Sequence, residues 1–286
     1  MSGENSYAEK FNKVFNYIDR HLDEDLTLER LSRVANFSKF HFLRQFSEYT
    51  GISVIRYVQL MKLKRASYRL VFNSGDRIID IALDAGFENP ESFSRAFKNT
   101  FGQTPSEFRK GPAWKPWNEQ YNFPNRERML NMEVNIVDFG QVKIAVLEHR
   151  GPAELINDST KIFIDWRKTS GFSPVKSSRT FGIAYDNPDT TEPEKFRFDI
   201  CGSITADIPA NPHGVVNRLI PAGRCARVRH LGSHDSMKAS IYYLYREWLP
   251  QSGESLRDFP LYFCYLNFIS ETPEHELATD IYLPLK

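Results

Sequence analysis

Residues 42–46 read FLRQF and residues 93–97 read FSRAF, so one five-residue pattern occurs twice, 51 positions apart. Gly51 and Gly102 follow the two copies at the same offset. Upstream of each copy, Ala35 and Ala85 supply the small residue that a tight turn between two helices needs. Repetition at a fixed period indicates a repeated supersecondary unit. We therefore predict two helix-turn-helix units.

The whole segment 5–110 has apolar residues at helical spacing. Thr27 and Ser38 are suited to cap the second and third helices. The segment 53–73 predicts a longer helix that is apolar on more than one face, as expected of a helix packed between two bodies. Further helices are expected over 78–83, 90–101 and 105–109. The prediction is an all-α domain, residues 1–111, in which a long helix joins two helix-turn-helix units.

In such a unit the second helix enters the major groove of DNA. Phenylalanines at positions 42, 46, 93 and 97 are expected to face inward, which turns other side chains outward. In the first helix these are Lys39, Phe40, Leu43 and Arg44, and in the second Glu91, Ser92, Ser94, Arg95 and Lys98. Arginine can donate two bonds to guanine, and Phe40 and Leu43 can pack on thymine methyls, although spacing alone also allows Phe40 in the core. Glu91 is expected to weaken the second helix through repulsion from phosphate.

The formal net charge of +1 hides a basic window from Lys39 to Arg69, which has seven basic residues against the single acid Glu48. Such a run is either a solvated helix face or an electrostatic footprint for nucleic acid. The duplicated helix-turn-helix pattern favours the second interpretation.

Residues 112–131 are predicted to be a linker, because they are rich in proline and lack periodicity. Beyond them the apolar pattern alternates by two, which is typical of strands. Strands are expected over 133–137, 142–149, 179–185, 196–204, 224–230, 261–268 and 279–285, with helices over 154–169 and 235–249. Residues 132–286 are therefore predicted to be an α+β domain.

This second half also repeats itself. His149 precedes Gly151 as His230 precedes Gly232, an offset of 81, and Trp166 matches Trp248 at an offset of 82. Each copy reads strand-helix-strand-strand, so we predict a duplicated module with pseudo-twofold symmetry and a groove between its copies.

Composition and spacing give no sign of catalysis. The three cysteines have no metal-like spacing and are expected to be buried thiols, and His149 and His230 are expected to mark strand ends. No catalytic triad or paired-carboxylate spacing stands out. We predict no catalytic residue, no cofactor, no metal and no enzyme. The absence of a signal-like start and of a long apolar run, together with the cysteine usage, predicts a cytoplasmic protein that has no membrane partner.

Residues 7–110 resemble the AraC/XylS family of bacterial transcription regulators. The resemblance rests on residues 38–46 (SKFHFLRQF), 86–98 (GFENPESFSRAFK) and 101–105 (FGQTP). It implies a monomer that sets two helices into successive major grooves of double-stranded DNA, with Phe40, Leu43 and Arg44 in the first. Pro90, Glu91, Ser92, Ser94 and Arg95 stand at the reading positions of the second. The family further implies RNA polymerase as a partner and a location on the bacterial nucleoid.

Residues 132–286 resemble the gyrase-inhibitor-like domain family, on the stretches 181–188 (FGIAYDNP), 194–199 (EKFRFD) and 280–284 (DIYLP). Such modules commonly bind a lipophilic, often cationic, effector with aromatic side chains and one acidic residue. The resemblance implies Asp280 as that acid, with Tyr185 and Tyr282 near it. Further aromatic candidates are Trp166, Trp248, Phe263 and Tyr265, although the tryptophans also fit a core. Two alternatives remain, a protein-interaction module and a small-molecule hydrolase fused to the DNA reader.

Overall fold

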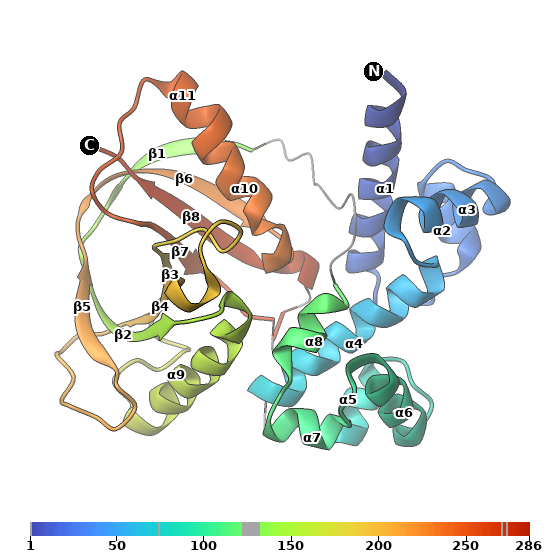
Figure 1. The fold of residues 1–286 in the computed structure, drawn as a ribbon, viewed down its shortest axis with the longest axis horizontal. Coiled ribbons are helices and arrows are strands. Elements are labelled where there is room, and N and C mark those ends of the chain that lie inside the picture. Colours follow the sequence, from blue (N-terminus) through green and yellow to red (C-terminus); the bar gives the residue numbers. More distant parts are fainter. Residues whose placement is uncertain (1, 74, 122–131, 270, 273) are drawn as a thin grey trace. The chain divides into compact units, whose positions relative to one another are not determined.

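The computed structural model describes residues 2–73, 75–121, 132–269, 271–272 and 274–286. The chain forms two compact units, Met1–Met129 with Ile269–Leu277, and Leu130–Phe268 with Ala278–Lys286 (Figure 1). Within the described residues, no helix is both long enough and apolar enough to cross a membrane.

The first unit is helical, as predicted. Its helices are α1 (Ser2–Arg20), α2 (Leu28–Val34), α3 (Lys39–Thr50), α4 (Val54–Phe72), α5 (Ile78–Asp84), α6 (Pro90–Phe101), α7 (Pro105–Lys110) and α8 (Trp114–Glu119). The predicted caps of α2 and α3 form, because the Thr27 and Ser38 hydroxyls accept the backbone N–H groups of Arg30 and His41. The helices α3 and α6 both end on a left-handed glycine, at φ values of 77° for Gly51 and 74° for Gly102.

Helix α4 serves two separate cores, which explains why it is apolar on more than one face. Its N-terminal half places Tyr57 in a cluster of rings with Phe15 and Phe46. Its C-terminal half places Leu70 in a second cluster built around Phe97 and the other aromatic side chains of α6 to α8. Each helix-turn-helix unit therefore has its own core, and one helix is shared by both.

The predicted linker begins later than expected. Residues 114–119 form α8, and both Trp114 and Trp117 are buried against the second core, edge-to-face at 5.3 Å. Burial of two indole rings outweighs the weak helical periodicity of this stretch. The rest of the predicted linker, residues 122–131, lies outside the described residues.

Residues Ile269–Leu277 also belong to the helical unit, although they connect two strands of the sheet. Within this unit the Lys64 ammonium donates to the Glu274 carboxylate at 2.7 Å, and both side chains are buried. Lys64 is therefore a core residue of α4. Although it belongs to the basic window 39–69, it is not available to contact DNA.

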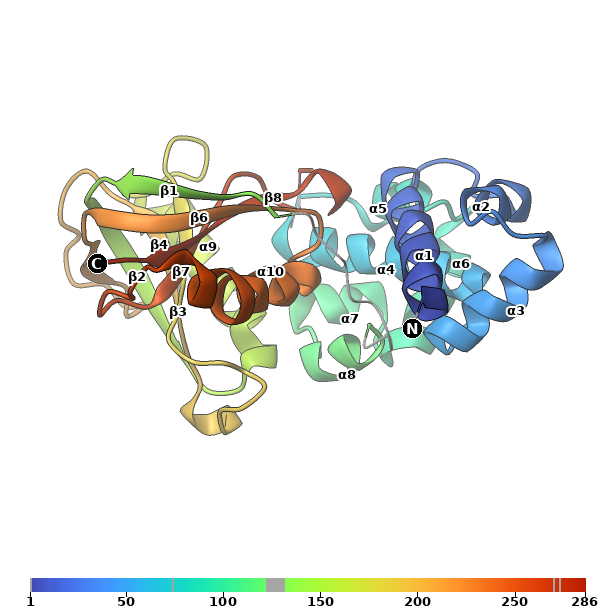
Figure 2. The same ribbon diagram turned by 90° about the horizontal axis from the view of Figure 1, so that it is seen from above.

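The second unit is an antiparallel sheet with helices. Its strands are β1 (Val134–Phe139), β2 (Val142–Arg150), β3 (Thr180–Ala184), β4 (Arg197–Ser203), β5 (Val216–Ile220), β6 (Gly223–Leu231), β7 (Leu261–Tyr265) and β8 (Ala278–Pro284), in the order β1-β6-β8-β7-β3-β4-β2-β5. Figure 2 shows the edge strand β1 alongside β6. Strand β5 was not predicted, because it is an edge strand on which only Ile220 is buried, so it has no apolar alternation.

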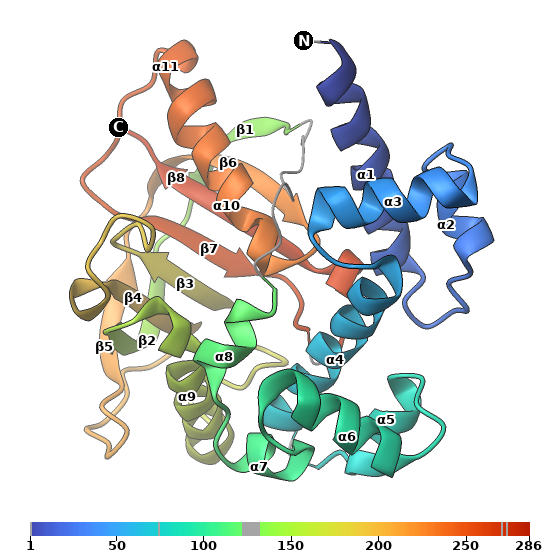
Figure 3. The same cartoon turned by 45° about the vertical axis from the view of Figure 1, so that its right-hand side comes forward.

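Both predicted helices of this unit pack on one face of the sheet (Figure 3). These are α9 (Ile156–Ser170) and α10 (Met237–Tyr243), and α10 continues through a π-turn, Leu244–Trp248, into α11 (Leu249–Ser252). Phe163 of α9 and Leu244 of the π-turn pack in one core with the strand residues Ala226 and Ile281. We call this side of the sheet the helix-covered face.

The other side curls inward. The rings of Phe139 on β1 and Phe181 on β3 lie 6.3 Å apart, although three strands separate β1 from β3. In a flat sheet four strand spacings would put these strands about 19 Å apart. We call this side, which carries Phe139, Phe181, Tyr262 and Tyr282, the concave face.

The left-handed glycine of α6 generates a stability prediction. An added Cβ at Gly102 would meet no atom within 4 Å, so Gly102→Ala should cost only the backbone strain of a positive φ, about 1–2 kcal/mol. Gly111→Ala is the matched control, because that site is equally open but has a φ of −154°. Urea unfolding followed by far-ultraviolet circular dichroism should show a loss for Gly102→Ala and almost none for Gly111→Ala. Equal effects would contradict this account.

Candidate DNA-binding helices and effector site

Helix α3 presents the predicted outward face. Phe42 and Phe46 are fully buried, whereas Phe40 is 88% exposed and therefore lies outside the core. Leu43 and Arg44 are exposed beside it. An aromatic side chain held this far into water on a capped, rigid helix is positioned for contact with a partner.

Lys39 and Arg44, the lysine and the arginine of α3, differ in their ion-pair partners. The Lys39 ammonium forms an ion pair with Glu29 of α2. Arg44 has no carboxylate partner among the residues that the structure describes. Arg44 is therefore the more available cation of this face.

Helix α6 repeats the arrangement with different chemistry. Asn89 caps it, since its side-chain oxygen accepts from the Ser92 backbone at 2.8 Å, and Pro90 occupies the first turn. The Ser92 hydroxyl is already used, because it donates to the Asn89 carbonyl. Around it lie the exposed Glu91, Arg95 and Lys98 and the half-buried Pro90 and Ser94.

Much of the predicted basic window holds the helices together. Arg56 of α4 bonds Thr100 at the end of α6 at 3.2 Å, and Arg69 forms ion pairs with Asp76 and Asp84 around α5. Arg65 pairs with Asp23. These arginines fix the helix-turn-helix units on α4 and are not available as DNA contacts.

The structure divides the predicted effector residues between the two faces of the sheet. Trp166, Trp248, Phe263 and Tyr265 pack in the helix-covered core. Asp280, Tyr282 and Tyr185 belong to the concave face, where Tyr282 stacks on Tyr262 at 5.0 Å. Alternation sends neighbouring residues of a strand to opposite faces, so the two sets line no common site. Asp280 therefore shares its face of the sheet with Tyr262 and Tyr282 and not with the tryptophans.

Asp280 is buried and already paired. Its two oxygens accept from Nε and Nη2 of Arg229 on β6, at 2.7 and 2.9 Å. This bidentate geometry satisfies the carboxylate within the protein.

Asp199 is a second carboxylate on this face, at the position that corresponds to Asp280 in the other half of the sheet unit. It was not predicted from the sequence. Asp199 is buried, and it accepts from Arg150 at 2.9 Å and from the Tyr185 hydroxyl at 2.8 Å. Burial and the bond to Asp199 raise the pKa of Tyr185 well above its usual value. The sequence does contain a signal for Asp199, because Asp199 and Asp280 are 81 residues apart and each precedes Ile in a strand.

His149 and His230 also have matched environments. Their Nδ1 atoms each lie 2.9 Å from a serine hydroxyl, Ser159 or Ser240. Their Nε2 atoms face the carbonyls of Pro152 and Ser233. Each ring thus connects the end of a strand to the helix that follows it. The described residues contain no cluster of side chains able to hold a metal ion.

The cysteines are buried and free. Burial raises the pKa of Cys264 to about 11 and raises those of Cys201 and Cys225 as well. These thiols stay protonated at neutral pH, so they are poor nucleophiles.

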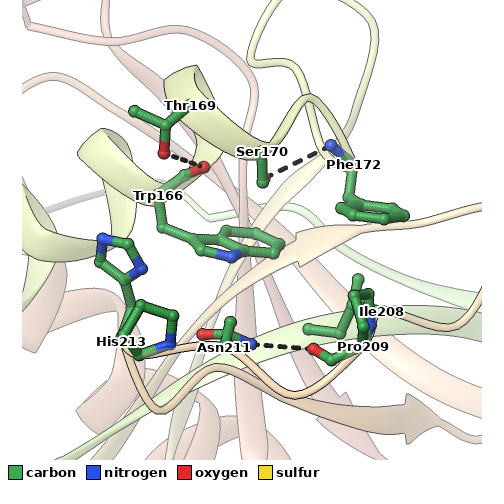
Figure 4. Close-up of a pocket in the computed structure, with 9 residues that line it drawn as sticks. Trp166, Thr169, Ser170, Phe172, Ile208, Pro209, Asn211 and His213 are labelled. Atoms are coloured by element: carbon green, nitrogen blue, oxygen red, sulfur yellow. Dashed lines mark hydrogen bonds between the residues drawn. The ribbon is translucent and has the colours of Figure 1, made fainter.

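A small pocket of about 210 Å³ lies between the C-terminal end of α9 and the β4–β5 connection (Figure 4). Trp166, Thr169, Ser170 and Phe172 form one wall, and residues 208–213 of the β4–β5 connection form the other. Asn211 holds this connection in place through bonds to the backbone of Val215. Trp166 therefore borders a different space from the concave face.

The fold and these sites define the class of the protein, a DNA-binding transcription regulator with a small-molecule binding domain. The GyrI-like small molecule binding domain family matches residues 132–286, and a helix-turn-helix domain family of AraC type matches residues 31–111. The chain belongs to the GyrI-like family and carries an AraC-type domain ahead of it.

Known proteins are similar to each half of the chain. The probable transcriptional regulator YgiV of Escherichia coli K12 is 47% identical over 156 residues, which are 54% of this chain and 98% of that protein. The right origin-binding protein of E. coli K12 is 35% identical over 98 residues, 34% of each chain. The crystal structure of the EcmrR C-terminal domain aligns with a TM-score of 0.46 at 18% identity, over 55% of this chain and 99% of that one. The matched families and these relatives do not describe enzymes.

The ion pair of Asp280 generates a prediction. Arg229→Gln leaves a buried carboxylate without its partner and should lower the free energy of unfolding by about 1–3 kcal/mol. Adding Asp280→Asn should restore most of this loss, since an amide needs no counter-charge. Lys195→Gln, in an ion pair exposed on both sides, is the control and should change little. A strictly additive double variant in urea unfolding would show that the two side chains are not coupled.

Proposed function

We propose that the protein reads DNA sequence with α3 and α6, each set into one of two successive major grooves. The observation that carries this proposal is the pair of arginines, Arg44 and Arg95, at equivalent outward positions of two capped helices. Neither has a carboxylate partner in the described part of the chain. A guanidinium without a counter-charge is available for the bidentate bond to guanine.

The remaining outward residues have roles that follow from their chemistry. Phe40 and Leu43 supply apolar contact to thymine methyl groups, and Lys39 and Lys98 supply charge for phosphates. Pro90, Ser92 and Ser94 lie on the face of α6 that would read the DNA. The Asn89 cap fixes the backbone of this first turn of the helix. Glu91 accepts from cytosine or reduces affinity, which makes α6 the weaker reader.

The second unit is the sensor in this proposal. Strands β2 and β6, and likewise β4 and β8, begin 81 residues apart, and each copy has its own buried aspartate that is paired with an arginine. These matches support a duplicated module with pseudo-twofold symmetry. The effector in this proposal is a lipophilic small molecule bound at the concave face, beside the partly exposed Tyr185 and Tyr282 and near Asp280.

Sensing is favoured over catalysis. Both buried acids of the concave face are held by arginines, so neither is a free general base, and the thiols are protonated. As a regulator of this class the protein acts on the bacterial nucleoid in the cytoplasm, with RNA polymerase as its further partner.

The DNA-binding proposal makes a quantitative prediction. Affinity of the full chain for its operator should fall steeply with salt, with a slope of about −0.9 per neutralised phosphate. Arg44→Ala should cost about 1–3 kcal/mol and relax specificity at one base pair. Arg95→Ala should cost less, because Glu91 shares its helix. The measurement is a fluorescence-anisotropy titration.

The control is Arg197→Ala in the sheet unit, where the guanidinium is engaged by Asp186. This variant should bind DNA as the parent does. Full affinity in both Arg44→Ala and Arg95→Ala would refute reading by α3 and α6.

A further inference from the structure

The pocket between the C-terminal end of α9 and the β4–β5 connection lies apart from the concave face. Its volume is about 210 Å³, and we call it the Trp166 pocket. An apolar cavity of about 150 Å³ is large enough to hold a benzene molecule. The Trp166 pocket therefore has room for one aromatic ring that carries a short substituent.

The walls of this pocket are mainly apolar. Trp166 and Ile208 of the lining are buried, whereas Phe172 and Pro209 are exposed beside them. In Figure 4 the Phe172 ring lies on the α9 side, and Ile208 and Pro209 lie opposite it. A single flat ring that enters the pocket would contact apolar side chains of both walls.

Several polar side chains of the lining are engaged within the protein. The Thr169 hydroxyl donates to a backbone carbonyl of α9 at 3.0 Å, and the Ser170 hydroxyl accepts from the Phe172 backbone N–H at 3.4 Å. The Asn211 amide donates to the Val215 carbonyl at 2.8 Å and accepts from the Val215 N–H at 3.2 Å. These three side chains are committed to the protein's own backbone and shape the pocket.

The indole N–H of Trp166 has no such partner. Trp166 is 2% exposed, and this N–H has no acceptor among the residues that the structure describes. Figure 4 shows the indole nitrogen turned toward the opposite wall, on the side of Asn211. The N–H group of a buried tryptophan usually has an acceptor, since a buried donor without one is costly. An acceptor that enters the pocket would satisfy this donor.

The electrostatics of the pocket favour a neutral ligand. The described lining contains no carboxylate, lysine or arginine, and its His213 is exposed to solvent. Arg167 of α9 is not part of this lining, and its guanidinium donates to the Ser173 carbonyl and the Thr180 hydroxyl, at 2.5 and 2.6 Å. The C-terminal end of α9 carries the negative end of the helix dipole, which opposes an anion. The indole N–H is a positive edge, which opposes a cation.

We propose that the Trp166 pocket binds a neutral aromatic molecule of one ring that carries a carbonyl group. The ring packs between Phe172 and Pro209, and the carbonyl oxygen accepts the hydrogen bond of the Trp166 indole N–H. A carbonyl fits better than a hydroxyl, because it brings no donor that needs a partner of its own. The inference goes beyond the proposed function, since this site is separate from the concave face and from the helices that read DNA.

The test compares probes of one ring size that differ in charge and in their acceptor. These are acetophenone, ethylbenzene, benzoate and benzylammonium, each titrated into the full chain labelled with nitrogen isotope. Each of the four tryptophans contributes one indole signal to the proton–nitrogen correlation spectrum, and Trp166→Phe identifies the signal of Trp166. We expect acetophenone to shift this signal downfield and saturably, as a new hydrogen bond does. Ethylbenzene should bind about three- to tenfold more weakly, the scale of one neutral hydrogen bond, and both ions should also bind more weakly than acetophenone.

Two variants separate the hydrogen bond from packing, with affinities measured by saturation transfer to the probe. Trp166→Phe keeps a ring but removes the donor, so acetophenone should bind about as weakly as ethylbenzene does. Phe172→Ala changes a side chain outside the core and should weaken both neutral probes. Trp248→Phe is the matched control, because Trp248 has the corresponding position in the other copy but does not line the pocket. It should bind all probes as the parent does, and the remaining indole signals verify the folding of each variant.

The inference is overturned if acetophenone leaves the Trp166 signal in place. It is also overturned if ethylbenzene binds as tightly as acetophenone and Trp166→Phe changes nothing, or if an ion binds most tightly at this signal. Probe binding that Tyr282→Ala abolishes and Trp166→Phe leaves intact would support the sensor on the concave face and overturn a site at Trp166. Failure of this inference is therefore distinguishable from failure of the proposed function.

Discussion

The packing of α4 into two aromatic cores is the constraint on which the DNA-binding unit depends. At 1.5 Å per residue, a helix of 19 residues is about 28 Å long, close to the ~34 Å between successive major grooves on one side of DNA. The Tyr57 ring is held in one core and Leu70 in the other. Because both cores are closely packed, α4 fixes the spacing of α3 and α6 and leaves little freedom for either to move alone.

In the sheet unit the corresponding constraint is alternation along the strands. Residues 280 and 282 reach the concave face, while residues 281 and 283 enter the helix-covered core. A single strand thus contributes both to the core and to the concave face. The buried carboxylates of the concave side, Asp199 and Asp280, are each held by an arginine, since an unpaired carboxylate at those positions would be costly.

Local patterns predicted most of the fold. The helices of the first unit, their serine and threonine caps and the glycine ends appear where spacing and capping chemistry placed them. Prediction failed where tertiary burial overrode a weak local signal, as for α8, and where an edge strand had no apolar face, as for β5. Helix periodicity predicted most outward residues of α3 and α6, but it left Phe40 open between the surface and the core, and only the structure, in which Phe40 is 88% exposed, decides this.

The amino-acid sequence by itself determined the class of the protein, the helices of its first half and most of the outward side chains of α3 and α6. These depend on period, caps and residues close together in the chain. Only the tertiary structure decided which aromatic side chains share a face with Asp280, and which arginines already have a carboxylate. Arg229 and Asp280 are 51 residues apart, and Arg150 and Asp199 are 49 apart. Their pairing depends on the register of neighbouring strands, and no local pattern specifies that register.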